Sequence, residues 1–301
     1  MVSKEPFVVA CIPAYNEERS IAKVIVQAFR YVDRVIVCDD GSSDLTGEIA
    51  ERLGADVVRH DVNFGYGASL RSLFVRAREI GADIVVTLDA DGQHEADHIP
   101  RLLDPILAGK ADIVIGSRFL SESDASKVPS YRRIGIKVIT DLTSKFSYGD
   151  LKDAQSGFRA YNRKALNSIL PSEQGMGVST EILLKAKDNG LKICEVPIVT
   201  HYNMDTRPSK TNPLYHGVDV ILSTIKHLSI RHPMLFYGIP GFSSLLVALS
   251  FWVWTLQNYS ITGRLITNLA LIALGATLIG LMLMTTAIIL WVTISVIRER
   301  I

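Results

Sequence analysis

Residues 84–94 read Ile-Val-Val-Thr-Leu-Asp-Ala-Asp-Gly-Gln-His, a short apolar run followed by two aspartates that flank one alanine. The run Ile84–Leu88 has the length and the β-branched content of a buried strand. Asp89 and Asp91 come directly after it, so we expect both carboxylates in a loop at the carboxyl end of that strand. An Asp-x-Asp loop can be a solvated turn or a cation site, and the rest of the sequence decides between these two interpretations.

Apolar runs typical of strands alternate with segments of helical periodicity on both sides of this stretch. The predicted strands cover Phe7–Pro13, Arg34–Asp40, Asp56–Arg59, Ile84–Leu88 and Asp112–Ile115. The predicted helices cover Ser20–Val32, Leu45–Leu53, Ala68–Ile80 and His98–Leu107. This alternation predicts an α/β domain with a mostly parallel sheet flanked by helices, in which ligands bind beyond the carboxyl ends of the strands.

Polar or glycine-containing motifs follow each of the five predicted strands. They read Pro-Ala-Tyr-Asn-Glu at 13–17, Asp-Asp-Gly-Ser at 39–42, Asn-Phe-Gly-Tyr-Gly-Ala at 63–68, Asp-Ala-Asp-Gly-Gln-His at 89–94 and Gly-Ser-Arg-Phe at 116–119. Because the carboxyl ends of parallel strands meet at one edge of a sheet, we expect these motifs to converge. The glycine pair at 65 and 67 lacks the third glycine of a dinucleotide-binding motif and does not follow the first strand, which argues against a Rossmann dehydrogenase.

The converging carboxylates favour a cation site over a solvated turn. Unpaired carboxylates at close range repel and raise each other's pKa, and a divalent cation relieves the repulsion. Asp89 and Asp91 flank one residue, so both can turn to one ion, and Gln93 offers a neutral oxygen. Oxygen ligands suit Mg²⁺ or Mn²⁺, which keep positions open for substrate phosphates.

Charged residues nearly disappear after Pro233, although the whole chain has a net charge of +1, which gives no bulk field for nucleic acid. Two apolar runs, 234–257 and 265–297, reach the about 20 residues that a helix needs to cross a bilayer. The second run is over-long, so it must tilt or continue past the membrane. A buried helical hairpin of a soluble protein would keep a polar face, which argues against that alternative.

We therefore expect three parts: a domain at 1–212, an amphipathic helix at 213–232, and a membrane anchor of two transmembrane helices at 233–301. Apolar residues of 213–232 recur at helical spacing, which fits a helix lying flat on the membrane or one packed on its own domain. The connecting loop carries one cation, Arg264, and the outer flanks carry several. The positive-inside tendency then places the large domain and both termini in the cytosol. Association of copies through the hairpin is a further expectation.

Taken in order, the strand-end motifs resemble those of the inverting glycosyltransferases of family 2, which have a GT-A fold. More narrowly, they resemble polyprenyl-phosphate sugar synthases such as dolichyl-phosphate mannose and glucose synthases. The resemblance runs from about Phe7 to Gly217 and includes Asp-Ala-Gln-Ser-Gly-Phe-Arg at 153–159 and Arg-Pro-Ser-Lys at 207–210. It implies a nucleotide-sugar donor, a dolichyl or polyprenyl phosphate acceptor, Mg²⁺ or Mn²⁺ as cofactor, and a place in the cell membrane or, in a eukaryote, the membrane of the endoplasmic reticulum.

The resemblance also assigns residue roles. It implies that the nucleotide-sugar is bound by Pro13, Tyr15, Glu17, Cys38, Asp40, Gly67, Asp89 and Ala90. It implies that the metal is bound by Asp89, Asp91 and Gln93. It implies that phosphates and the acceptor are contacted by Arg118, Arg132, Arg133, Arg159, Arg207, Ser209 and Lys210. It gives catalytic roles to Asp91, Asp153 and Arg118.

Asp153 stands where relatives that use a hydroxyl acceptor place their general base. A phosphate monoester needs no such base, because its second pKa is about 6 and it is largely dianionic at neutral pH. Direct displacement would convert an α-linked donor into a β-linked lipid product. Ile136 and Val138 stand where many relatives have a Ser-x-Gly stretch, and the Gln-x-x-Arg-Trp signature of processive synthases is absent from the sequence. Two alternatives stay open: transfer to a hydroxyl of a lipid-linked saccharide or glycolipid, and a non-catalytic membrane subunit.

Overall fold

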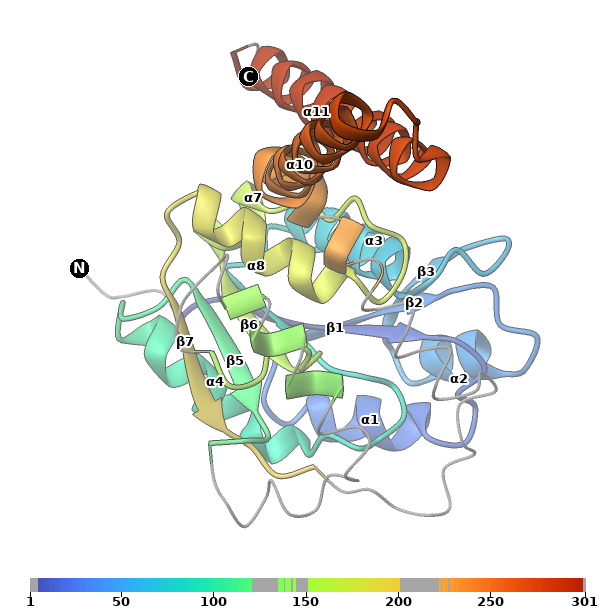
Figure 1. The fold of residues 1–301 in the computed structure, drawn as a ribbon. Coiled ribbons are helices and arrows are strands. Elements are labelled where there is room, and N and C mark those ends of the chain that lie inside the picture. The colour runs from blue at the N-terminus through green and yellow to red at the C-terminus, as the bar shows by residue number, and fades with distance from the viewer. Residues whose placement is uncertain are drawn as a thin grey trace. The chain divides into compact units, whose positions relative to one another are not determined.

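The computed structural model describes residues 5–120, 151–200 and 228–299, together with 135–137, 139–141, 143–144, 222 and 224–226. The chain divides into two compact units, Met1–Thr224 and Ile225–Ile301 (Figure 1). Of the expected helix at 213–232, residues 222, 224–226 and 228–232 are described, and all of them except 232 are helical. The remainder of that helix lies outside the described residues, and the expected three-part division stays a prediction.

A seven-stranded sheet forms the centre of the first unit. In spatial order its strands are β3 (Asp56–Arg59), β2 (Arg34–Asp39), β1 (Val8–Ala14), β4 (Ile84–Thr87), β6 (Arg159–Asn162), β5 (Ile113–Ser117) and β7 (Ile193–Pro197). β6 runs antiparallel to both of its neighbours, and the other pairs are parallel. The prediction of a mostly parallel sheet flanked by helices is therefore confirmed.

Two helical layers cover the two faces of this sheet (Figure 1). One layer contains α1 (Ile21–Ala28), α2 (Thr46–Arg52), the 3₁₀ turn η1 (Ala96–His98) and α4 (Ile99–Leu107). The other contains α3 (Tyr66–Glu79), α7 (Arg163–Ser168) and α8 (Val178–Asp188). Successive residues of β1 point to opposite faces, so Ala10 and Ile12 enter the first core while Val9 and Cys11 enter the second.

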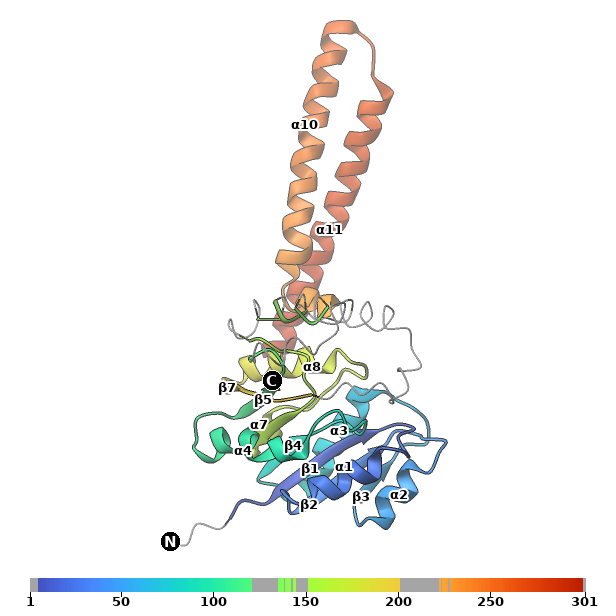
Figure 2. The ribbon, with the colours of Figure 1, turned by 90° about the horizontal axis from the view of Figure 1, so that it is seen from below.

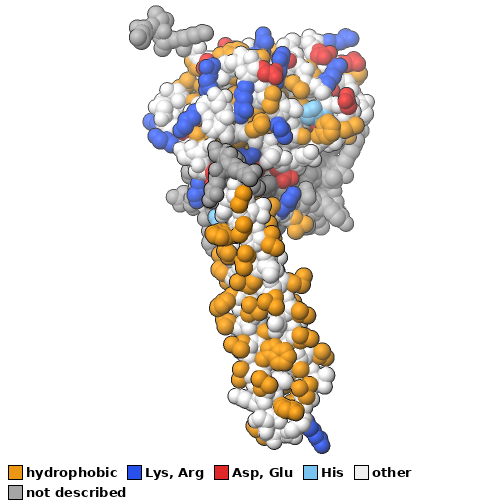
Figure 3. Space-filling model, turned by 90° about the horizontal axis from the view of Figure 1, so that it is seen from above, with side chains coloured by type: hydrophobic (Ala, Val, Ile, Leu, Met, Phe, Trp, Pro, Cys, Tyr) orange, Lys and Arg blue, Asp and Glu red, His pale blue; other side chains and the backbone are white. Residues whose placement is uncertain are grey.

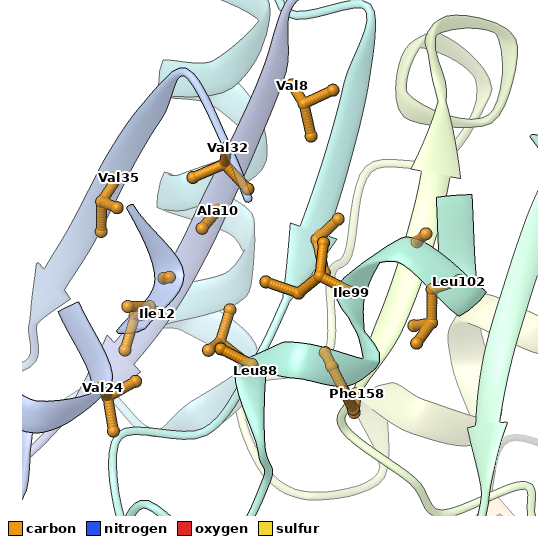
Figure 4. Packing of buried hydrophobic residues seen from close by; sticks show 14 of the residues in the cluster. Val8, Ala10, Ile12, Val24, Val32, Val35, Leu88, Ile99, Leu102 and Phe158 are labelled. Atoms are coloured by element: carbon orange, nitrogen blue, oxygen red, sulfur yellow. The ribbon is translucent and has the colours of Figure 1, made fainter. Parts of the chain in front are cut away.

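The first core packs residues from β1, β2, α1 and α4 against one another (Figure 4). Ile12, Val24, Leu88, Ile99, Leu102 and Phe158 are among the buried residues of this cluster that Figure 4 labels. This packing fixes the carboxyl ends of β1 and β4, which carry the first and fourth polar motifs. The fold thereby holds the Asp-x-Asp loop on a rigid edge of the sheet.

The second unit is a pair of long helices. A π-helical turn, Met234–Gly238, leads into α10 (Ile239–Thr262), and α11 (Thr267–Glu299) returns beside it (Figure 2). Met234–Thr262 and Thr267–Val296 are long and apolar enough to span a membrane, with mean hydropathies of 1.7 and 2.2. Only 17% of each apolar window is buried, unlike the core helices of a soluble protein, and apolar side chains cover the helices (Figure 3). The expected C-terminal apolar hairpin is therefore present.

Close backbone packing and a side-chain hydrogen bond join α10 to α11. A Cβ at Gly280 would lie 2.8 Å from Leu245 side-chain atoms and 3.0 Å from the carbonyl oxygen of Gly241. Ser244 Oγ donates to the carbonyl of Ala276 at 2.8 Å. Small residues and such polar contacts are the common means of helix association in lipid, where no hydrophobic force drives helices together.

Candidate functional site

Two strand-end loops are hydrogen-bonded to each other at the carboxyl edge of the sheet. The Asn16 amide donates to Ser42 Oγ at 2.9 Å, and Asn16 Oδ1 accepts from the Ser43 amide at 2.8 Å. The Glu17 amide donates to Thr46 Oγ1 at 2.8 Å. Asn16 has a φ of 56°, in the left-handed region that asparagine tolerates better than most residues. The motifs that follow β1 and β2 therefore lie side by side.

Three carboxylates gather at this edge: Glu17, Asp89 and Asp91. Burial raises the pKa of Glu17, and the nearby charges of Asp91 and Asp89 raise it further. Burial also raises the pKa of Asp89. Asp91 Oδ1 accepts from the Gln93 amide at 2.9 Å, which fixes the turn of the loop. The repulsion that Glu17 experiences from Asp91 and Asp89 is of the kind that a divalent cation relieves, so these residues fit the expected cation site.

Asp89 is held from the side of α3 and β6. Tyr66 Oη donates to Asp89 Oδ1 at 3.2 Å. Gly157 leaves the space for this contact, because a Cβ there would lie 2.7 Å from Tyr66 Oη and 2.9 Å from Asp89 Oδ1. The glycine of the Asp-Ala-Gln-Ser-Gly-Phe-Arg motif is thus explained by its close approach to the Asp-x-Asp loop.

His94 is a site residue to which the sequence analysis gave no role, although it ends the Asp-x-Asp motif. Its Nδ1 lies 3.7 Å from Asp89 Oδ2 and has no hydrogen-bond partner among the described residues. The ring stacks on Phe158, with 5.2 Å between ring centroids. Burial lowers the pKa of His94 to about 4, so the imidazole is neutral at neutral pH. A neutral ring facing Asp89 can position that carboxylate without pairing with its charge.

Asp40 and Cys38 tie the end of β2 to the loop that leads into α3. Asp40 is 3% exposed, and its oxygens accept from the Phe64 amide at 3.0 Å and the Gly65 amide at 2.8 Å. His60 Nδ1 lies 2.6 Å from Asp40 Oδ1, and His60 Nε2 lies 3.7 Å from Cys38 Sγ. Burial raises the pKa of Cys38 to about 12, so its thiol stays neutral. These contacts hold the loop, and nucleotide binding by Asp40 and Cys38 stays a prediction.

Gly67 has a packing role in this structure. Its amide donates to the carbonyl of Gln174 at 2.7 Å, and a Cβ at this position would lie 2.0 Å from the carbonyl oxygen of Glu173. Only glycine allows the start of α3 to approach residues 173–174 this closely. Its expected contact with the nucleotide stays a prediction.

The other three expected nucleotide-site residues lie at the ends of β1 and β4. Pro13 is buried in β1 opposite Cys38, and Ala90 is buried between the two aspartates. Tyr15 is 46% exposed, so its ring is free to meet a ligand. All three lie at the carboxyl edge where the expected donor site falls.

Arg118 and Asp153 form a bidentate ion pair at the end of β5. Arg118 Nε donates to Asp153 Oδ2 at 2.7 Å, and Nη2 donates to Oδ1 at 2.8 Å. The Arg118 amide adds a third bond to Oδ2 at 3.1 Å. Asp153 is fully buried, and its own amide donates to Glu195 Oε1 at 2.8 Å. The charge of Asp153 is therefore compensated by one guanidinium and removed from solvent.

Arg159 differs from the expectation that it faces phosphates. It is 2% exposed, and it donates to the carbonyls of Ser156 at 2.8 Å, Ala154 at 2.7 Å and Ser179 at 3.3 Å. Three bonds to carbonyl oxygens explain how a guanidinium is tolerated in the core. In this structure Arg159 cross-links the segment around Asp153 to α8. The expected phosphate residues Arg132, Arg133, Arg207, Ser209 and Lys210 lie outside the described residues.

Together these observations describe an α/β enzyme whose sheet edge carries carboxylates suited to a cation beside a buried arginine–aspartate pair. The chain belongs to glycosyl transferase family 2, which matches residues 9–170. The resemblance inferred from the strand-end motifs is thereby confirmed.

Two relatives each match about two thirds of this chain. The UDP-N-acetylglucosamine–dolichyl-phosphate N-acetylglucosaminyltransferase of Methanococcus voltae is 33% identical over 222 residues, which cover 67% of this chain and 88% of that protein. The dolichyl-phosphate hexose transferase of Haloferax volcanii is 33% identical over 216 residues, which cover 70% of this chain and 90% of that protein.

A solved structure shares the fold. Glucosyl-3-phosphoglycerate synthase from Mycobacterium tuberculosis, in complex with Mn²⁺, UDP-glucose and phosphoglyceric acid, is 25% identical to this chain with a TM-score of 0.58. The match covers 74% of this chain and 79% of that one.

Proposed function

We propose that this protein transfers a sugar from a nucleoside diphosphate sugar to dolichyl or another polyprenyl phosphate, with inversion at the anomeric carbon. Membership in the family and the relatives named for dolichyl phosphate support this reaction. The observation that carries the choice of acceptor is the buried pair of Arg118 and Asp153.

The proposed donor site is built on the carboxylates of Asp89 and Asp91, at the end of β4. Asp89 and Asp91 would hold Mg²⁺ or Mn²⁺ together with the donor diphosphate, and the related synthase in complex with Mn²⁺ and UDP-glucose supports this assignment. When bound, the ion would stabilise the negative charge on the departing nucleoside diphosphate. Glu17 would lie beside the same charge. Burial is the main cause of its raised pKa, and the charges of Asp91 and Asp89, which a cation would offset, raise the pKa further.

The proposed acceptor depends on whether Asp153 can act as a general base. A hydroxyl acceptor must lose its proton to a base within hydrogen-bond reach during attack. Both oxygens of Asp153 are occupied by Arg118, and the side chain is fully buried. A phosphate monoester is largely dianionic at neutral pH, because its second pKa is about 6, and needs no base. The pair therefore favours a phosphate acceptor, and direct displacement gives a β-linked product from an α-linked donor.

The second unit supports a lipid acceptor. Two apolar helices would anchor the chain in the membrane in which a polyprenyl phosphate is dissolved. We place the first unit and both termini in the cytosol, where nucleotide-sugars are made. The sugar stays open, since the two relatives are named for different sugars.

The test is a transfer assay with the purified full-length protein in detergent. GDP- and UDP-sugars carrying a radiolabel are incubated with Mn²⁺ and dolichyl phosphate, and the label is counted in the organic phase. Asp91→Asn is expected to lower the rate by about 100-fold or more, since a bound metal contributes several kcal/mol and each 1.4 kcal/mol is tenfold. Asp104→Asn, a change of an exposed aspartate on α4, serves as the matched control.

Three outcomes would contradict the proposal. An undiminished rate in Asp91→Asn with a chelator present would remove the metal from the mechanism. Labelling of dolichol, or of a lipid-linked saccharide, in preference to dolichyl phosphate would favour the hydroxyl-acceptor alternative. Failure of every donor and acceptor would favour the non-catalytic subunit, which the intact Asp89 and Asp91 argue against.

A further inference from the structure

Three potential metal ligands lie together just beyond the Asp-x-Asp loop: Glu95, Asp97 and His98. One carboxylate oxygen each from Glu95 and Asp97 and one ring nitrogen of His98 all lie within 4.8 Å of one another. Among the described residues this is the only group of three His, Cys, Asp or Glu side chains that meets this spacing. It is distinct from the pair Asp89 and Asp91, which the proposed function uses.

Acidic residues at this place have an ordinary explanation. Glu95 and Asp97 precede α4, and negative charges are favourable at the N-terminal end of a helix. Asp97 is 60% exposed, as a solvated charge would be. This explanation accounts for the two carboxylates without any ligand, so they carry no inference by themselves.

His98 is not explained in this way. Its side chain is 7% exposed, and its Nδ1 is buried without a hydrogen-bond partner in the described part of the chain. A buried polar nitrogen without a partner destabilises the folded state, because it loses its hydrogen bonds to water without replacement. The nitrogen lies 3.7 Å from Asp97 Oδ1, too far for a hydrogen bond. Two ligands about 2.1 Å from one ion are about 3.4 Å apart at a tetrahedral angle, so this separation suits a shared ion.

We propose that Glu95, Asp97 and His98 bind a divalent transition-metal ion, with His98 Nδ1 as the nitrogen ligand. Two ligands on opposite sides of an ion would be about 4.2 Å apart, so a pair at the 4.8 Å limit would have to close by about 0.6 Å. The exposed side chain of Asp97 is free to adjust its position around an ion. Water would complete the coordination on the exposed side.

The ligand set indicates the class of ion. One imidazole with two carboxylates suits Zn²⁺, Mn²⁺, Co²⁺ or Ni²⁺, whereas Mg²⁺ prefers oxygen ligands only. The site therefore selects against Mg²⁺, which the all-oxygen Asp89–Asp91 pair would accept. Binding of the ion would fix η1 and the start of α4 relative to the Asp-x-Asp loop. The last aspartate of that loop, Asp91, lies four residues before Glu95 in the chain.

The experiment separates this site from the donor metal site. Full-length protein carrying Asp89→Asn and Asp91→Asn is purified without a histidine tag and titrated with Zn²⁺ by calorimetry. Co²⁺ absorption in the visible range serves as a second readout, because it reports coordination at a site with a nitrogen ligand. One ion is expected to bind per chain, and excess Mg²⁺ is expected not to displace it.

Ligand variants complete the test. Added to the double variant, Asp97→Asn or His98→Gln is expected to weaken Zn²⁺ binding by at least about tenfold, since even outer-shell partners contribute 10–100-fold. Asp104→Asn, on the adjoining helix α4, is expected to leave binding unchanged. Asp97→Asn is the decisive variant, because this side chain is exposed and its loss does not endanger folding. No stoichiometric binding in the double variant, or equal binding with Asp97→Asn and Asp104→Asn, would overturn the proposal.

Discussion

Asp153 is fully buried, and its oxygens accept three hydrogen bonds from Arg118. At the scale of single residues, this ion pair distinguishes the site from one in which the aspartate is free to act as a general base. A buried ion pair is costly to form, but removing one partner is worse, since it leaves an uncompensated charge in the core. Comparing the removal of one partner with the removal of both therefore tests whether Asp153 is charged and held by Arg118.

Arg118→Gln is expected to destabilise the protein by about 3–5 kcal/mol, because Asp153 then stays buried without its guanidinium partner. Unfolding of the full-length protein by heat in detergent measures the loss. The double variant Arg118→Gln with Asp153→Asn is expected to recover much of the stability, since it removes both charges. Equal losses in the single and double variants would show that the pair is not coupled.

At the scale of elements, α8 positions the start of α3 through a short intermediate segment. Glu181 of α8 is 4% exposed and accepts from the amides of Ser172 and Glu173, each at 2.9 Å. Lys185 Nζ lies 2.8 Å from Glu181 Oε1. The next residue, Gln174, accepts from the Gly67 amide. Glu181 thus holds the segment against which the glycine-containing motif packs.

The pKa of Glu181 gives a pH-dependent prediction. Burial raises this pKa, but hydrogen bonds from Lys185 and Ser172 outweigh burial and lower it below its ordinary value of 4.5. A lowered folded-state pKa means that the stabilisation is fully present above pH 4.5 and is lost as the pH falls below it. Glu181→Gln is therefore expected to cost about 1–3 kcal/mol at pH 7, and the difference from the wild type should shrink towards pH 3.

Unfolding at several pH values measures this difference. Glu48→Gln, at an exposed position of α2, is the control and is expected to have no comparable effect. A difference between Glu181→Gln and the wild type that stays constant from pH 7 to pH 3 would show that the ionised form of Glu181 does not stabilise the fold.

At the scale of the whole molecule, one chain combines an α/β unit with a pair of long apolar helices. Mean hydropathies of 1.7 and 2.2 mark the two spans of the second unit. The cations Arg231 and Arg298 flank the hairpin, and the turn between its helices carries one cation, Arg264. The positive-inside tendency then predicts that this turn faces away from the cytosol.

Cysteine labelling tests this orientation in intact cells. In a Cys194→Ser background, Ser260→Cys at the exposed end of α10 is expected to react with a membrane-impermeant maleimide added from outside. Lys110→Cys, at an exposed position of the first unit, should react only after permeabilisation. The other native cysteines, Cys11 and Cys38, are buried. The reverse pattern would place the first unit on the wrong side for cytosolic nucleotide-sugars.

Local patterns were sufficient for much of the fold. The predicted strand Asp56–Arg59 agrees with β3, and the run Ile84–Leu88 contains β4, because a short β-branched run is a local property. The two apolar helices were equally predictable, because a helix that crosses a lipid bilayer needs a long uncharged stretch. The antiparallel β6 was not predicted. Its sequence, Arg-Ala-Tyr-Asn, carries no strand periodicity, and its place between β4 and β5 is fixed by pairing with distant residues.

The sequence by itself determined the alternation of strands and helices, the carboxylates at the end of β4, and the apolar hairpin, since each follows from neighbours in the chain. Only the tertiary structure decided which charges are free and which are paired. The sequence predicts that Arg159 faces phosphates at the surface. In the structure its side chain is buried and donates to the carbonyls of three residues. The resemblance places Asp153 where relatives with a hydroxyl acceptor have their base, and here it predicts sugar orientation or a modest base role. In the structure Arg118, 35 residues away in the chain, donates to both of its oxygens. Charge compensation depends on distances in space, and a sequence pattern does not contain them.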